Sequence, residues 1–297
     1  MPLTTRARLL VVASAALAST GGAAIKLSSL SALQVAGLRA ALAAVVLAIA
    51  LRPARASWHR GTLAVGVVQG AMMVSFVTSN KLTTAASAIY LQSTAPLYVL
   101  ALSPLLLGEA AHRRDLAYLA VFALGLSAFF VETDPVQATA PDPLLGNAIA
   151  AAGGVGWALT ILGFRWLAAR AAVPAAVAAA GAGRPADPAG AAAVLANAFV
   201  FLACLPWLRP IPPATGAPDW LAIAWLGVVQ VGLAYVCLTR GIRHLPAFET
   251  SLLLLVEPVF SPVWAWLAHG EQPGRGAIAG GAVILAATAV RSLRESR

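Results

Sequence analysis

The residues best suited to chemistry in this sequence are polar and aromatic side chains that stand inside long apolar segments. Side chains three or four positions apart share one face of a helix, and such faces recur in several of these segments. With no water nearby, a polar face must point toward protein or an aqueous cavity. Aromatic rings and carboxamides together suit an amphipathic organic solute, whose apolar part the rings would cover. We therefore predict a substrate-binding site formed by Gln69, Phe76, Tyr90, Thr94, Tyr98, Trp157, Gln230 and Glu257.

Each of these residue types also has an ordinary structural role in a membrane helix. Tyr98 and Trp157 are aromatic residues of the kind that lie at the membrane interface or fill packing gaps. Hydroxyls of Ser and Thr often bond to their own backbone or to a neighbouring helix. Gln69 and Gln230 are stronger candidates, because a carboxamide that recurs in two apolar segments is costly to bury without a function. A hydrogen bond between helices would also satisfy it.

Four prolines divide between two apolar segments at corresponding places: Pro96, Pro104, Pro258 and Pro262. A proline removes one backbone hydrogen bond and clashes with the preceding turn, so it kinks a helix or makes it deformable. Interrupted segments in matching positions often mark a transport site. We predict Pro96 and Pro258 to be hinges, with static kinks as the alternative.

Catalytic and metal-binding chemistry finds little support in the sequence. The four histidines lie in loops or at the ends of apolar segments, and no His-Glu-x-x-His, Gly-x-Ser-x-Gly or P-loop motif occurs. Cys204 and Cys237 fall inside apolar segments, where small buried side chains are common. We predict no catalytic residue, no metal site and no cofactor. A membrane-embedded enzyme remains the alternative from another functional class.

The composition indicates which surroundings the protein has. Charged residues make up 10% of the 297 positions and apolar residues 60%, whereas soluble domains carry about 25% charged residues. So few charges cannot cover a water-facing surface, and the lipid bilayer is therefore the expected partner of most of it. The net charge of +9 is spread between apolar segments rather than gathered on one patch, which argues against binding nucleic acid.

The apolar segments predict an all-α membrane protein. A membrane-spanning helix needs about 17–25 mostly apolar residues, and open sheet edges are not tolerated in lipid. Ten segments qualify in our interpretation, near residues 9–27, 31–51, 62–79, 85–107, 115–132, 144–167, 191–208, 219–239, 247–268 and 275–292.

Basic residues in the loops set the orientation, because cytoplasmic loops carry an excess of Lys and Arg. With the N-terminus inside, most arginines fall on the inner side, and the outer side receives only Lys26, Lys81, Arg209 and Arg275. We predict a multi-pass protein of the bacterial inner membrane with both termini in the cytoplasm. A cleavable signal peptide is the alternative interpretation of the N-terminus, but its removal would reverse the charge bias of every later loop.

The two halves of the chain repeat one another. A shift that carries Pro96 onto Pro258 also aligns Gly108-Glu109 with Gly270-Glu271, and the tetrad Gly-Val-Val-Gln at 66–69 recurs at 227–230. Each repeat holds five predicted helices, and an odd number forces the second copy into the membrane upside down. We predict one membrane domain over 1–297, in which a repeat at 1–132 and an inverted repeat at 144–297 flank a connecting loop at 133–143.

These features resemble the EamA branch of the drug/metabolite transporter superfamily. The resemblance rests on the ten predicted spans, the duplicated halves, and a Pro followed by Gly-Glu in each half. Lys26 and Arg39 also stand where that family places basic residues. The Trp-Gly common in the family's first span is absent, although Trp157 occupies the equivalent place in the sixth. The resemblance implies export of metabolites or amino acids from bacterial cells, and some similar members export aromatic amino acids.

We therefore predict a secondary transporter that exports small metabolites, with amino acids, including aromatic ones, as the expected substrates. A drug or nucleotide-type metabolite transporter of the same fold is the alternative. Two modes of energy coupling stay open: facilitated export down a gradient, and coupling through Glu257. The oligomeric state is also left open, and a monomer is compatible with the sequence.

Overall fold

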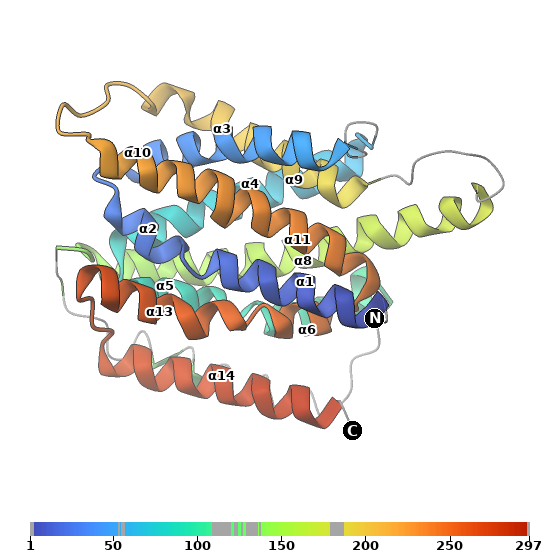
Figure 1. Cartoon of the computed structure of the whole chain (residues 1–297). Coiled ribbons are helices and arrows are strands. Elements are labelled where there is room, and N and C mark those ends of the chain that lie inside the picture. The colour runs from blue at the N-terminus through green and yellow to red at the C-terminus, as the bar shows by residue number, and fades with distance from the viewer. Residues whose placement is uncertain are drawn as a thin grey trace.

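The computed structural model describes residues 3–52, 54, 57–108, 120–121, 124–125, 127–128, 136, 138–178 and 187–295, and the regular elements within these ranges are helices. They lie alongside one another in an elongated bundle, beyond which one long helix extends at its C-terminal end (Figure 1). The last helix runs along one side of the bundle. The predicted all-α class is confirmed for the described residues.

Six helices make up the described part of the N-terminal region: α1 (Leu3–Ala18), α2 (Gly21–Leu27), α3 (Ala32–Ala50), α4 (Arg60–Leu82), α5 (Ala85–Gln92) and α6 (Ala95–Leu106). The C-terminal region begins with the longest helix and ends with a helix on the flank of the bundle. Its elements are α8 (Pro143–Ala178), α9 (Pro188–Cys204), the 3-10 helix η2 (Leu205–Trp207), α10 (Ala217–Ala224), the π-helix η3 (Trp225–Leu233), α11 (Ala234–Gly241), the 3-10 helix η4 (Ile242–His244), α12 (Ala247–Leu253), α13 (Val256–His269) and α14 (Arg275–Glu295).

Eight helical stretches in the described part of the chain are long and apolar enough to cross a membrane. They are Leu3–Leu27, Ala32–Ala50, Arg60–Leu82, Ala85–Leu106, Pro143–Ala171, Pro188–Trp207, Ala217–His244 and Ala247–His269. Each overlaps one of the ten predicted segments. The predicted segment 115–132 lies almost wholly outside the described residues, and so does most of the predicted loop 133–143. The predicted segment 275–292 forms α14, which is not among the eight.

Two of these stretches are broken at the places that the prolines predicted. Between α5 and α6 the chain turns at Ser93 and Thr94, and Pro96 lies in the first turn of α6. Between α12 and α13 it turns at Leu254 and Leu255, and Pro258 lies in the first turn of α13. The first turn has no use for the missing N–H of proline, so each helix restarts there without a lost bond. Both predicted interruptions are present.

Two other departures from a regular helix were not predicted. The first spanning stretch breaks between α1 and α2, where Ser19 and Thr20 form a turn. The stretch Ala217–His244 changes from α-helix to the π-helix η3 and back. A π-helix closes hydrogen bonds five residues apart and so redirects the side chains that follow it.

Close packing explains the glycines at the start of α2. A methyl group on Gly21 would lie 2.8 Å from the Nε2 atom of Gln230, and one on Gly22 would lie 2.9 Å from the Cβ atom of Ala85. Small residues allow helices to approach in this way inside a membrane. Helix α2 therefore sits tightly between η3 and the start of α5.

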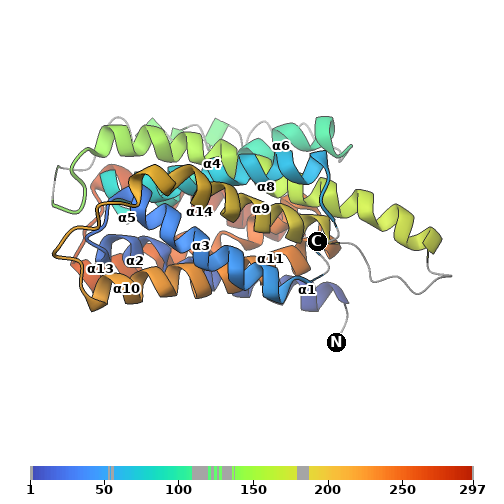
Figure 2. The ribbon, with the colours of Figure 1, turned by 90° about the horizontal axis from the view of Figure 1, so that it is seen from above.

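Helices from the two ends of the chain are interleaved rather than segregated. Helix α4 packs against α8 and α9, α3 packs against α9 and η3, and α1 packs against α11. Figure 2, seen from above, shows the same mixing of colours across the bundle. The interior therefore contains an interface between the described residues of 3–108 and those of 138–295, and polar side chains from both regions meet there.

Candidate functional site

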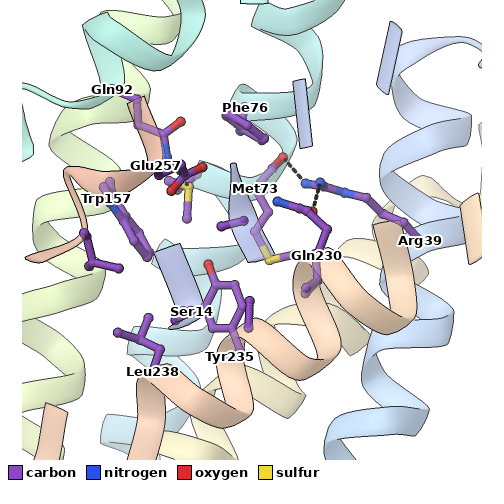
Figure 3. Close-up of a pocket in the computed structure, with 15 residues that line it drawn as sticks. Ser14, Arg39, Met73, Phe76, Gln92, Trp157, Gln230, Tyr235, Leu238 and Glu257 are labelled. Carbon is purple, nitrogen blue, oxygen red and sulfur yellow. Dashed lines mark hydrogen bonds between the residues drawn. The ribbon is translucent and has the colours of Figure 1, made fainter. Parts of the chain in front are cut away.

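A cavity opens in this interior and is lined by both parts of the chain (Figure 3). It encloses about 470 Å³ of empty space, including the open space at its mouth. Its walls combine aromatic, carboxamide, charged and apolar side chains: Ser14, Ala18, Arg39, Met72, Met73, Phe76, Gln92, Trp157, Gln230, Val231, Ala234, Tyr235, Leu238, Leu254 and Glu257.

A second cavity of about 290 Å³ adjoins the first and shares Gln92, Trp157, Leu254 and Glu257 with it. It is also lined by Pro96 and Pro258, and so it lies between the two broken spans. The polar cavity therefore reaches the two points at which the backbone departs from a continuous helix.

Arg39 supplies the positive charge of the site. Helix α3 buries it so that only 1% of its surface is exposed. Its Nη1 atom donates to Oε1 of Gln230 at 3.1 Å, and its Nη2 atom donates to the carbonyl of Met73 at 3.2 Å. The guanidinium lies 5.9 Å from the centre of the Phe76 ring, a distance at which a cation is attracted to an aromatic face. Its Nε atom has no hydrogen-bond partner.

Glu257 supplies the negative charge. It is 8% exposed and lies in the first turn of α13, because the break after α12 starts a new helix there. The N-terminal end of a helix carries a partial positive charge that favours a carboxylate. In the described part of the chain the carboxylate of Glu257 makes neither a hydrogen bond nor an ion pair. The site therefore holds both signs of charge without joining them.

Aromatic rings form one wall of the cavity. The rings of Trp157 and Tyr235 meet edge to face with their centres 6.3 Å apart, and Phe164 packs on Tyr235 from behind at 6.2 Å. Such geometry is the favoured one for aromatic pairs. The hydroxyl of Tyr235 lies beside the carboxamide of Gln69. This wall offers an apolar solute a rigid surface next to the two charges.

The cavity brings together some of the residues predicted from the sequence. Phe76, Trp157, Gln230 and Glu257 line it. They come from α4, α8, η3 and α13, four elements that are distant in the sequence. Arg39, which the resemblance singled out as a basic position, lines it as well.

The other predicted binding residues lie outside the lining in this conformation. Gln69 is completely buried and its Nε2 atom lies 3.9 Å from the sulfur of Met73. Tyr90 packs against Gly281 of α14. The hydroxyl of Thr94 donates to the carbonyl of Leu91 at 2.7 Å. Tyr98 packs against the main apolar core.

Sequence reasoning missed Ser14, Gln92 and Tyr235 in the lining. Tyr235 follows Val231 of the lining by four positions, an ordinary helical spacing, but no polar face was traced through this segment from the sequence. Gln92 immediately precedes the break between α5 and α6, where the helical face cannot be extrapolated. Only the rarity of a carboxamide in an apolar segment could have singled it out. Among the described residues, no group of three His, Cys, Asp or Glu side chains could hold a metal ion.

A family model decides the class of protein. The model for the EamA-like transporter family matches residues 5–131 and 144–293. The chain belongs to the EamA-like transporter family. It is therefore a multi-pass membrane transporter rather than an enzyme, and its interior cavity is a candidate site for a transported solute.

A solved structure shares the fold of this EamA-like transporter. It is described only as a crystal structure of a protein, it is 21% identical in sequence, and it superposes with a TM-score of 0.66. The match covers 98% of this chain and 97% of that one. No curated protein matches the chain.

One end of the bundle is tied by a buried ionic network. The ammonium of Lys26 pairs with Oε1 of Glu271 at 3.0 Å and also donates to the carbonyls of Thr83 and Thr139. Glu271 accepts from the backbone N–H of Ala85 at 2.8 Å and from the Thr139 hydroxyl at 2.9 Å. The network joins the end of α2, the start of α5, the segment before α8 and the segment after α13.

The opposite end carries ion pairs that are more exposed. Arg8 of α1 pairs with Glu249 of α12 at 2.6 Å, with 56% and 31% of their side chains exposed. Arg243 pairs with Asp187, which caps the start of α9. Glu249 thus lies outside the lining of the cavity. The buried network and the exposed pairs hold the two ends with different strengths, because solvent screens exposed pairs.

Proposed function

We propose that this EamA-like transporter exports small amphipathic metabolites, with amino acids, including aromatic ones, as its substrates. The observation that carries the proposal is the interior cavity, where Arg39, Gln230 and Glu257 face an aromatic wall. Buried polar groups inside a membrane domain mark solute pathways. A solute with charged and aromatic parts matches the polar and apolar parts of this lining.

We propose further that the chain has ten transmembrane helices arranged as two inverted five-helix repeats, 1–132 and 144–297, joined by residues 133–143. Three features support this arrangement: the repeated tetrad, the double match of the family model, and the equivalent breaks beside Pro96 and Pro258. In transporters of this plan the substrate binds near the midplane between the repeats. The loop charges favour both termini in the cytoplasm of a bacterial cell, with the protein in the inner membrane.

Transport in this proposal proceeds by alternating access. Pro96 and Pro258 act as hinges in the broken spans, and the smaller cavity lies directly between them. In the proposed orientation the network of Lys26 and Glu271 lies at the periplasmic end, which is therefore the tied end in this conformation. Opening toward the periplasm requires this network to separate, whereas the exposed pair of Arg8 and Glu249 is already in contact at the other end.

A cationic aromatic drug is the second candidate substrate, because Glu257 offers a buried carboxylate beside Trp157. A nucleotide fits less well. It carries several negative charges, and Arg39 is the one cation in the lining of the two described cavities. The two candidates differ in charge, and a transport assay separates them.

The experiment is counterflow into proteoliposomes that contain the purified full chain, screened across amino acids, nucleosides and cationic dyes. We expect exchange of aromatic amino acids that falls at least tenfold in Trp157→Ala. Trp207→Ala is the matched control, because Trp207 is 55% exposed on the surface and its loss should leave exchange unchanged. Exchange of dyes or nucleosides without exchange of any amino acid would contradict the proposal.

A further inference from the structure

Two buried and opposite charges face one cavity without meeting. Arg39 is 1% exposed and Glu257 is 8% exposed, and no ion pair within 4.0 Å joins them. Arg39 donates only to two neutral oxygens, and its Nε atom is left without a partner. The carboxylate of Glu257 has no polar partner among the described residues. Uncompensated charges are costly away from water and are normally paired. Each of these two charges therefore lacks a counterion that a bound solute could supply.

The surrounding helices keep the two charges apart. The Gln230 oxygen and the Met73 carbonyl hold the guanidinium against the face of Phe76. Gln230 is positioned by the π-helix η3 and by Gly21, where even one methyl group would meet its amide. Glu257 is fixed separately by the start of α13. Figure 3 shows Arg39 and Glu257 approaching the pocket from opposite sides, with Met73 between them in this view, Tyr235 below, and Trp157 beside Glu257. A solute that entered would find one charge on each side and aromatic rings alongside.

We propose that the cavity recognises a zwitterion at two poles: Arg39 binds the carboxylate of the solute and Glu257 binds its ammonium group. This inference rests on the proposed function and narrows its substrates to molecules that carry both charged groups. A guanidinium binds a carboxylate through geometrically matched N–H donors, and Gln230 orients it for that contact. Trp157 and Tyr235 cover the apolar part of the solute.

The two charged residues select among solutes, because a solute that lacks one of the two charged groups leaves Arg39 or Glu257 unpaired. A cation without a carboxylate neutralises Glu257 but leaves Arg39 buried and uncompensated. A monoanion does the reverse. Sites built to pair a polar group reject an analogue that lacks it by large factors, because the buried partner is then left unsatisfied. Only a zwitterion satisfies both charges at once, so the cavity selects against amines and against simple acids.

The test uses three solutes with the same ring: L-phenylalanine, phenethylamine, which lacks the carboxylate, and 3-phenylpropionate, which lacks the ammonium group. Counterflow is measured in proteoliposomes with the full chain and with Arg39→Gln, Arg39→Lys and Glu257→Gln. The control variants are Arg8→Gln and Glu249→Gln, which remove the same charges from the exposed pair. We expect the parent and both controls to prefer phenylalanine over each analogue by at least about 100-fold.

The cavity variants should shift this preference in opposite directions. Arg39→Gln should lower phenylalanine exchange and raise the relative exchange of phenethylamine. Glu257→Gln should raise the relative exchange of 3-phenylpropionate. Arg39→Lys keeps the positive charge and should keep the parent's order of preference. Misfolding cannot produce such a crossed pattern, because it lowers all three rates together.

Several outcomes would overturn the proposal. If either glutamine variant keeps the parent's ratios, or if both relax toward the same analogue, the charges do not act as separate poles. If the parent exchanges phenethylamine or a dye but not phenylalanine, the two-pole site fails while transport itself stands. If no amino acid is exchanged, the proposed function fails and this inference fails with it. A ligand-induced rise in the melting temperature of the purified parent, seen with phenylalanine and absent with both analogues, gives a readout of binding that is independent of transport.

Discussion

The tetrad Gly-Val-Val-Gln occurs twice in this transporter, and the two copies have different structures. The copy at 66–69 lies in the regular helix α4, and Gln69 is completely buried behind the aromatic wall. The copy at 227–230 lies in the π-helix η3, and Gln230 faces the cavity and holds Arg39. The same four residues therefore adopt different structures in the two copies, because the residues around them differ. Arg39 and Gly21 contact Gln230 of the second copy, whereas Gln69 of the first lies against Met73.

This difference suggests how a duplicated chain acquires a single site. A symmetric pair of carboxamides would offer the same group from both sides of the cavity. Here one carboxamide orients a guanidinium, while the other lies against the sulfur of Met73 beside Tyr235. The two broken spans, by contrast, stay alike in both halves. The proposed division is that the breaks provide symmetric movement and the carboxamides provide an asymmetric binding site.

The largest expected effect comes from removing one carboxamide at a time. Gln230→Ala deletes a hydrogen bond to a buried charge, worth about 1.5–3 kcal/mol, so the exchange rate per molecule should fall about tenfold or more. Gln69→Ala should lower the melting temperature but change the exchange rate per folded molecule less than about twofold. Counterflow normalised to the amount of folded protein measures the exchange rate of each variant, and thermal unfolding measures its melting temperature. Equal losses of exchange would mean that the two tetrads are functionally equivalent.

The breaks beside Pro96 and Pro258 are alike in both halves, and substituting these prolines tests whether the breaks act as symmetric hinges. In this conformation each proline lies in a first turn that has no use for its missing N–H, but Pro96→Ala or Pro258→Ala would supply the N–H that a continuous, unbroken span needs. That hydrogen bond is worth about 1 kcal/mol, which shifts a two-state population about fivefold. We expect the two variants to favour opposite-facing states while remaining folded. Cysteine accessibility from each side of the membrane, on a background without Cys204 and Cys237, measures the shift. Identical labelling of both variants and the parent would leave the prolines as static kinks.

A smaller effect should follow from crowding Gln230 indirectly. Gly21→Ala places a methyl group 2.8 Å from the Gln230 amide, whose flexible side chain can yield by turning away from Arg39. Exchange should therefore fall a few-fold. Gly153→Ala is the matched control, because a methyl group there meets only Ser75 at 3.7 Å, an ordinary contact. A normal rate in Gly21→Ala would show that the orientation of Gln230 does not govern transport.

The features that the sequence predicted correctly have local causes. Apolar segments of spanning length, and prolines that deprive a helix of a backbone bond, act wherever they occur, so the membrane helices and the breaks before Pro96 and Pro258 could be read directly. Phe76 and Trp157 line the cavity, a position that helical spacing indicated because it holds in the regular helices α4 and α8, while their role in binding stays a prediction. The family resemblance added Arg39. Composition alone does not indicate that this residue is buried.

The features that the sequence did not reveal have tertiary causes. The break in the first span is held by contacts from distant helices: Ser19 accepts from the indole of Trp264 at 3.1 Å, and Thr20 accepts from that of Trp225 at 2.9 Å. The π-helix η3 packs against α1, α2 and α3, which come from the other end of the chain. Helical periodicity cannot predict either feature, because neither arises from the segment in which it occurs.

A cysteine placed in the interior cavity shows most directly whether the solute binds there, because a bound solute protects the thiol from labelling. On a background of Cys204→Ala and Cys237→Ala, Ser14→Cys puts a thiol in the cavity lining, and Ser75→Cys puts one on α4 outside it. Labelling rates with a small thiol reagent are measured with and without phenylalanine. We expect phenylalanine to slow the labelling rate at position 14 several-fold and to leave the labelling rate at position 75 unchanged. Equal rates with and without phenylalanine at position 14, in protein that still exchanges phenylalanine, would contradict this expectation.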